Sequence, residues 1–281
     1  SGSGLALVLY ALSQGPQHGW ASAPVLATLL AGLACFAVLV PLELRVHDPM
    51  LRLALLRDRL FASCNLTGAF GFAAFLGILF VLPLFLQEGR GASALVSGLT
   101  TFPEAVGVIA ASQLIARLYP RVGPRRLMAG GLAGVTVAML LLTQVGSTTD
   151  LWLVRLIMFA MGAAMANVFM SLQTATFARI SRADTGQGSA IFNTQRQVAS
   201  ALGVAILATV LTGFGHGSAT GTGHGGGPVD LAGFHAAFVA AAALALAGAV
   251  VALSVHDEDA VATMHRRGAP PVPAADDLPS S

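Results

Sequence analysis

The stretch LFASCNLTGAFGFAAFLGILFVLPLFL, residues 60–86, contains no Asp, Glu, Lys or Arg. A bilayer core about 30 Å thick is crossed by about 20 helical residues that rise 1.5 Å each, so this stretch is long enough to span it. Only a helix or a closed barrel satisfies every backbone hydrogen bond inside lipid, and the alternating pattern of barrel strands is absent here. Residues 60–86 are therefore predicted to form a transmembrane helix.

The rest of the chain repeats this pattern. Hydrophobic residues make up 55% of the 281 residues and charged residues only 10%, whereas soluble domains average about 25% charged residues. Seven apolar runs are long enough to span a bilayer: 21–42, 60–86, 92–116, 127–145, 151–178, 187–214 and 231–255. The chain is thus predicted to be an all-α polytopic membrane protein, and its formal charge of +2 does not suggest a nucleic-acid partner.

Every basic residue is an arginine, and the arginines divide unequally between the two sides of the predicted bundle. Twelve lie in alternate loops or the C-terminal tail, Arg90 alone lies on the other side, and Arg155 and Arg196 lie within spans. Arginine-rich loops face the cytoplasm, so the C-terminus of this multi-pass protein is predicted to be cytoplasmic. The charged, proline-rich residues 257–281 are predicted to be a disordered tail.

A weak internal repeat relates two of the predicted spans. A shift of 96 positions superposes Ser93 on Ser189, Ala94 on Ala190, Ala105 on Ala201, Gly107 on Gly203, and Val108 on Val204. The shift pairs the second helix of one triplet (60–145) with the second helix of the next (151–255), and the second triplet enters from the opposite side. Such 3+3 inverted repeats occur in secondary transporters, so this construction is predicted here.

The span 187–214 carries polar residues near its middle. One helical arc of roughly 80° contains Ser189, Asn193, Arg196, Ser200 and Gly203. An arginine at the centre of a membrane helix costs about 2.5–3.5 kcal/mol on insertion scales. This stripe, with the adjacent Gln197, is therefore predicted to face other helices or a water-filled cavity.

Glu104 lies near the middle of the span 92–116. Under the repeat it falls on Ser200, and Thr100 falls on Arg196, so Thr100, Glu104 and Gly107 form the analogous stripe. A carboxyl at this depth can load and release a proton, which favours proton coupling or cation binding. A structural carboxyl held by interhelical hydrogen bonds is the alternative.

Other polar or small residues within spans are less distinctive. Asn167 and Gln173 either line a cavity or hydrogen-bond between helices, and Gly130 and Gly134 form a GxxxG pair that predicts a packing contact. No cofactor is predicted, and no metal site either, because the two histidines of the glycine-rich loop 213–230 have no fixed scaffold.

Three stretches resemble one transporter family. In LYPRVGPRRL (118–127), Arg121, Gly123, Arg125 and Arg126 fit a loop motif of the form G-x-L-A-D-R-x-G-R-R, with Pro120 in the acidic position. In GSAIFNTQRQVASALGVA (188–205), the residues that match a helix motif are Asn193, Arg196, Gln197 and Gly203. The third resemblance is ELRVHDPMLRLALLRDRLF (43–61) followed by LPLFLQEGRGASALVSGL (82–99). Together they resemble the C-terminal half of major facilitator superfamily transporters, in the fourteen-helix drug:proton antiporter family.

The resemblance implies a domain organisation. Residues 1–58 would hold the end of helix seven, helix eight and a cytoplasmic connector, residues 59–256 a six-helix C-terminal domain, and 257–281 the tail. The N-terminal transmembrane domain would be missing from this sequence, and would be a partner of the part present. The location implied is the bacterial inner membrane.

The resemblance also implies a function: proton-coupled efflux of drugs, antibiotics or amphipathic organic cations, with a small-molecule substrate and the proton as coupling ion. No ATP-binding loop of the G-x-x-x-x-G-K type is present, which agrees with coupling to an ion gradient. An enzyme is not predicted, because no nucleophile motif or metal-binding His pair appears. The remaining alternative is a non-transporting or half-size membrane module that acts through a partner or dimer.

Overall fold

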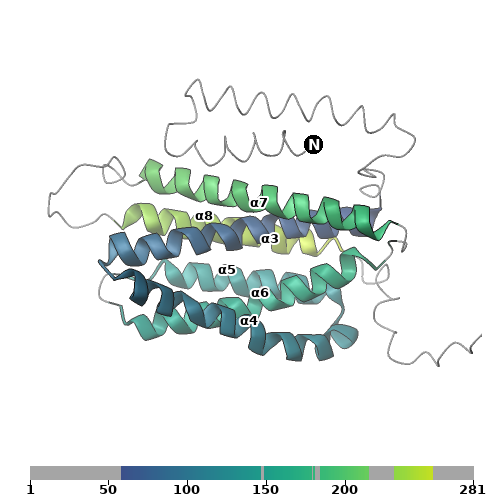
Figure 1. Ribbon diagram of the computed structural model, residues 1–281, viewed down its shortest axis with the longest axis horizontal. Coiled ribbons are helices and arrows are strands. Elements are labelled where there is room, and N and C mark those ends of the chain that lie inside the picture. Colours follow the sequence, from purple (N-terminus) through teal and green to yellow (C-terminus); the bar gives the residue numbers. More distant parts are fainter. Residues whose placement is uncertain (1–57, 147–148, 179, 181–183, 215–230, 256–281) are drawn as a thin grey trace, which may run out of the picture.

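The computed structural model describes residues 58–255 apart from 147–148, 179, 181–183 and 215–230, and these residues form a helical bundle (Figure 1). Its helices are α3 (Arg59–Leu84), the short π-helix η2 (Phe85–Gly89), α4 (Ala94–Val122), α5 (Pro124–Leu142), α6 (Leu151–Thr176), α7 (Thr185–Phe214) and α8 (Ala232–Ala252). The predicted span 21–42, the connector, most of the glycine-rich loop and the tail lie outside the described residues.

Six of the described helices are long and apolar enough to cross a membrane. They confirm the predicted spans from 60–86 to 231–255 and the all-α fold class. Two of the helix starts are fixed by aspartates: the Asp58 carboxylate accepts a hydrogen bond from the Phe61 backbone amide, and Asp150 accepts one from Trp152, both at 3.0 Å. Such caps satisfy amides that have no partner within the helix.

The segment 117–126, which the sequence places between the predicted spans 92–116 and 127–145 and which would therefore be a loop, is helical except at Gly123. α4 continues to Val122 and α5 begins at Pro124. The single residue between them, Gly123, has φ of 85°, a backbone conformation that favours glycine. Proline is well suited to the first position of the next helix because its φ is already helical. Arginine content indicated a loop here, but the chain reverses direction at one glycine.

The two triplets, α3–α5 and α6–α8, pack as an inverted repeat requires. α4 lies against α6 as α7 lies against α3, and α5 lies against α6 as α8 lies against α3. Figure 1 shows α4 and α7 on opposite sides of the bundle, with the other helices between them. Exchanging the triplets therefore maps each of these helix contacts onto another.

Glycines make equivalent close crossings in the two triplets. A Cβ added to Gly107 of α4 would meet the backbone carbonyl oxygen of Phe159 in α6, and one added to Gly203 of α7 would meet the carbonyl oxygen of Ala73 in α3. The 96-residue shift superposes these two glycines. The structure thus gives the weak sequence repeat a physical basis, since both positions need a residue without a side chain.

The opposing helices also supply glycines. A Cβ on Gly162 of α6 would meet the carbonyl oxygen of Glu104, and one on Gly77 of α3 would lie 3.1 Å from that of Gly203. By contrast, a Cβ on Gly130 would meet nothing within 4 Å, whereas one on Gly131 would lie 2.8 Å from the Ala164 carbonyl oxygen. Of the predicted GxxxG pair, Gly130 therefore makes no close contact among the described residues, whereas a Cβ on Gly134 would lie 3.0 Å from the Ala164 Cβ, so the predicted packing contact is confirmed at Gly134 alone.

α4 and α7 are the least covered helices. In the apolar 18-residue stretch of each helix, only 17% is buried in α4 and 28% in α7, against 61% in the helix that begins with α3. Large exposed apolar side chains on α4 include Leu95, Leu99, Phe102 and Ile109. Both outer faces are thus suited to lipid or to further helices.

The α4–α6 crossing predicts a difference between two glycines of one helix. Gly107→Ala should destabilise the bundle by about 1–3 kcal/mol, because overpacking forces a close backbone contact apart. Gly98→Ala is the matched control, since a Cβ at Gly98 meets nothing within 4 Å. Thermal unfolding in one detergent measures both variants, and equal unfolding temperatures would contradict the proposed role of the crossing.

Candidate functional site

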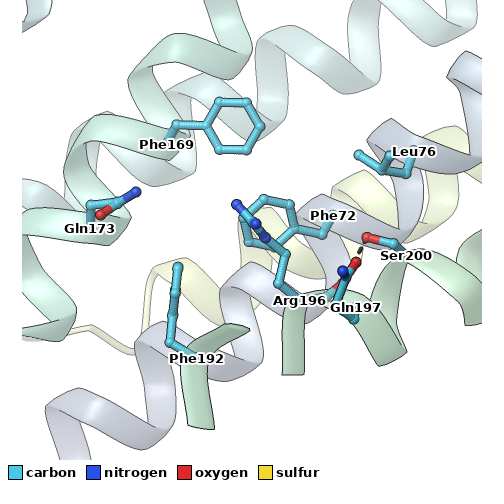
Figure 2. Close-up of a pocket in the computed structure, with 8 residues that line it drawn as sticks. All are labelled: Phe72, Leu76, Phe169, Gln173, Phe192, Arg196, Gln197 and Ser200. Carbon is cyan, nitrogen blue, oxygen red and sulfur yellow. Dashed lines mark hydrogen bonds between the residues drawn. The ribbon is translucent and has the colours of Figure 1, made fainter. Parts of the chain in front are cut away.

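A cavity of about 470 Å³ opens between α3, α6 and α7, and is called here the α3/α6/α7 cavity. Figure 2 shows the residues that line it: Phe72, Leu76, Phe169, Gln173, Phe192, Arg196, Gln197 and Ser200. Its volume falls within the range of about 300–1,000 Å³ that is typical of ligand sites. The cavity joins both triplets, because α3 belongs to the first and α6 and α7 to the second.

Arg196 is the only charged residue that lines this cavity among the residues described. Its guanidinium carbon lies 5.8 Å from the centroid of the Phe72 ring, within reach of a cation–π interaction. In Figure 2 the side chain extends from α7 into the space between Phe169 and Gln173. Arg196 is eleven residues after Thr185, the start of α7, so it lies about 16 Å along the helix.

Aromatic rings form the wall beside the guanidinium. The Phe72 ring centroid lies 5.3 Å from that of Phe169 and 6.2 Å from that of Phe192. Phe169 also meets Phe75 edge to face at 5.7 Å, and Phe192 meets Phe177 at 6.0 Å. Neighbouring rings thus hold the wall in place, since offset and edge-to-face pairs are favourable arrangements.

Neutral polar groups complete the lining. The Ser200 hydroxyl donates a hydrogen bond of 2.7 Å to the Arg196 carbonyl oxygen, one turn back on the same helix. Gln173 and Gln197 are exposed and line the cavity. Each amide can both donate and accept hydrogen bonds, so the cavity offers these groups as well as a positive charge.

Gln195 lies close to the cavity but on another face of α7. Both polar atoms of its amide are buried and have no hydrogen-bond partner among the described residues. Its oxygen would lie 3.7 Å from a Cβ placed on Gly68 of α3. Buried amides without partners are rare in proteins, so this position has a hydrogen-bonding capacity that the described contacts leave unused.

The structure brings some of the predicted polar residues together and places others elsewhere. Arg196, Gln197 and Ser200 share the cavity with Gln173, whereas Glu104 and three further residues do not line it. Each of these three further residues hydrogen-bonds to a carbonyl oxygen four residues earlier in its own helix: Asn193 to Ser189 at 2.9 Å, Thr100 to Val96 at 2.7 Å, and Asn167 to Ala163 at 3.0 Å.

Glu104 lies on α4, away from this cavity. Glu104 is half-buried, and its backbone carbonyl contacts Gly162 at the α4–α6 crossing. Within the described part of the chain its carboxylate has no hydrogen-bond or ion-pair partner. The predicted acid is therefore available to a proton or to a group from outside these residues, but it does not touch Arg196.

The loop motif residues lie where α4 meets α5. Arg121, Arg125 and Arg126 are exposed, whereas Gly123 is buried. Helix direction alternates, so these arginines and Arg59 lie at one end of the bundle. Arg90 belongs to the opposite end, where its guanidinium donates a hydrogen bond to the Thr149 carbonyl oxygen and ties two loops together.

Sequence reasoning missed the aromatic wall. Phe72, Phe169 and Phe192 lie in apolar spans among 15 phenylalanines, and an apolar ring gives no sign of whether it faces lipid, core or a cavity. Gln173 did carry a signal, because an amide within a span is unusual.

Comparison with known proteins places the chain in a family. Residues 1–204 match the family model described as Major Facilitator Superfamily. The chain is 31% identical over 251 residues to an uncharacterised MFS-type transporter, YcnB, of Bacillus subtilis (strain 168), a match that covers 88% of this chain and 52% of that protein. It is 30% identical over 214 residues to the puromycin resistance protein pur8 of Streptomyces alboniger, covering 75% and 42%.

A further relative is the multidrug resistance protein Stp of Mycobacterium tuberculosis (strain ATCC 25618 / H37Rv), 31% identical over 205 residues, which cover 73% of this chain and 38% of that protein. The chain thus spans about half or less of the length of these curated relatives. The family match and the six membrane-length helices make it a multi-pass membrane protein. It belongs to the major facilitator superfamily.

Proposed function

We propose that this chain forms the C-terminal half of a proton-coupled exporter of drugs or other amphipathic organic compounds. The observation that carries the proposal is the α3/α6/α7 cavity, which combines a guanidinium, two amides and three aromatic rings inside membrane-length helices. Ligand sites in general combine a mostly apolar wall with a few placed polar groups. The relatives named for puromycin and multidrug resistance support a drug as the cargo.

In this proposal a second six-helix domain completes the transporter. The low coverage of α4 and α7 supports a partner on these helices, and the greater length of the relatives supports a further domain. Rocking of the two domains around a central site would expose the cavity to each side in turn.

The proton is assigned to Glu104. Its half-buried carboxylate has no partner among the residues described, so it is free to exchange a proton. Glu104 also lies at the crossing with α6, the helix that supplies Phe169 and Gln173 to the cavity. A change of charge at Glu104 can therefore shift α4 against α6 and alter the cavity without contact between the acid and the substrate.

The membrane orientation is proposed from the arginines. The end of the bundle that carries Arg59, Arg121, Arg125 and Arg126 would face the cytoplasm of a bacterial inner membrane, together with the C-terminal tail. Arg196 would then lie about 16 Å from the cytoplasmic end of α7, near the middle of a bilayer core.

Loss of the cavity charge should impair transport. Arg196→Ala in the complete gene product is expected to lower drug export about tenfold or more, because hydrogen bonds to charged groups contribute about 1.5–3 kcal/mol. Export from energised membrane vesicles measures this. Arg155→Ala is the matched control, because Arg155 is another span arginine, lies over the Trp152 ring and does not line the cavity. Unchanged export by the Arg196 variant would reduce the polar stripe to a packing feature.

Glu104→Gln tests the proton assignment. This nearly isosteric change removes the titratable group, so substrate-driven proton exchange should be lost while the protein still inserts into the membrane. A pH-sensitive dye inside proteoliposomes measures the exchange. Glu88→Gln, at an exposed acid after α3, should retain exchange, and normal exchange by the Glu104 variant would remove this residue from the mechanism.

A further inference from the structure

We propose that the α3/α6/α7 cavity selects aromatic compounds that carry an anionic group, with Arg196 as the anion-binding residue. This inference rests on the proposed function and concerns the substrate class of the same site. It differs from the expectation of organic cations, which came from family resemblance and not from the residues of the cavity.

The first argument is the charge of the cavity. Arg196 contributes a positive charge, and no carboxylate lines the cavity among the residues described. Its guanidinium has no hydrogen-bond or ion-pair partner within the same residues, and its carbon lies 5.8 Å from the centroid of the Phe72 ring. A guanidinium offers five N–H donors in a planar fork that matches carboxylates and related oxyanions. An anionic ligand would satisfy these donors, whereas a cationic ligand would be repelled.

The second argument concerns the aromatic wall. Phenylalanine rings can attract a ligand cation, which would favour the opposite class of substrate. However, Arg196 already occupies the position over Phe72, at 5.8 Å. Phe169 and Phe192 flank this ring at 5.3 and 6.2 Å between centroids. The wall therefore suits the flat apolar body of a ligand whose charged group points toward Arg196.

The third argument concerns the depth of the site. A phospholipid phosphate is another oxyanion that an arginine can bind. Headgroups lie at the membrane surface, outside a hydrocarbon core of about 30 Å. Arg196 lies about 16 Å along α7 from its first residue, so it is too deep for a headgroup in its normal position. The depth favours a ligand that enters the cavity from water or from the acyl region.

Two probes of matched shape and opposite charge test the proposal. Binding of tritiated naphthalene-2-sulfonate to the complete gene product in phosphatidylcholine nanodiscs is to be measured in competition with unlabelled sulfonate or with trimethyl(2-naphthyl)ammonium. The sulfonate is expected to bind at least tenfold more tightly than the ammonium compound. Equal affinities, or tighter binding of the ammonium compound, would overturn the inference without need of any variant.

Variants then assign the effect to the guanidinium. Arg196→Gln should weaken sulfonate binding at least tenfold and leave ammonium binding unchanged or stronger, while Arg155→Gln should alter neither. Unchanged sulfonate affinity in the Arg196 variant would overturn the assignment. Nanodiscs that contain phosphatidylglycerol separate the two sources of oxyanion: abolished sulfonate binding would make a lipid the natural occupant and overturn the substrate class.

A transport measurement separates this inference from the proposed function. Proton exchange in proteoliposomes is followed with the sulfonate and with the ammonium compound as driving substrates. Exchange driven by the ammonium compound alone would leave an exporter in place and overturn the anion selectivity. Exchange driven by the sulfonate would support both the proposed proton-coupled export and the anion selectivity.

Discussion

The close crossing of α7 with α3 fixes the geometry on which the cavity depends. Gly203 meets the backbone of Ala73, and Ser200 and Arg196 lie three and seven residues before Gly203, on the same face of α7. Ala73 is adjacent in sequence to Phe72, whose ring lies 5.8 Å from the guanidinium carbon. A helix pair held at greater separation by a larger residue at 203 would not bring these groups together. Gly203 thus allows the close helix crossing that places Arg196 beside Phe72.

The equivalent crossing of α4 with α6 carries different chemistry. The repeat superposes Glu104 on Ser200 and Thr100 on Arg196. The first triplet therefore carries a carboxylic acid, and the second a positively charged guanidinium, at related depths. Glu104 does not line the α3/α6/α7 cavity, whereas Arg196 does. In the proposed mechanism this asymmetry separates the proton from the substrate, and α6 connects them because it contacts α4 and also lines the cavity.

Much of the fold could be predicted from the sequence because length and lack of charge are strong signals for membrane helices. The turn at Gly123 could not be, since its arginines and prolines are also typical of longer loops. Within the site, Arg196, Gln197 and Ser200 were detectable because a polar residue in a span needs a reason. Phe72 and its neighbouring rings were not detectable. The packing of the helices decides which face of an apolar helix lines a cavity, and the sequence alone does not reveal that packing.

The coverage of the helices bears on how the site would work in a complete transporter. α7 supplies Arg196 to the cavity and also has an outer face of low coverage. A domain that docks on this face would therefore contact the helix that carries Arg196. Insertion of an arginine at the centre of a span costs less when water or a partner reaches it. If the two domains rock, water would reach Arg196 while the cavity is open. Once the cavity closes, the guanidinium would need a counter-charge. An anionic ligand could supply that charge and so become part of the transport cycle.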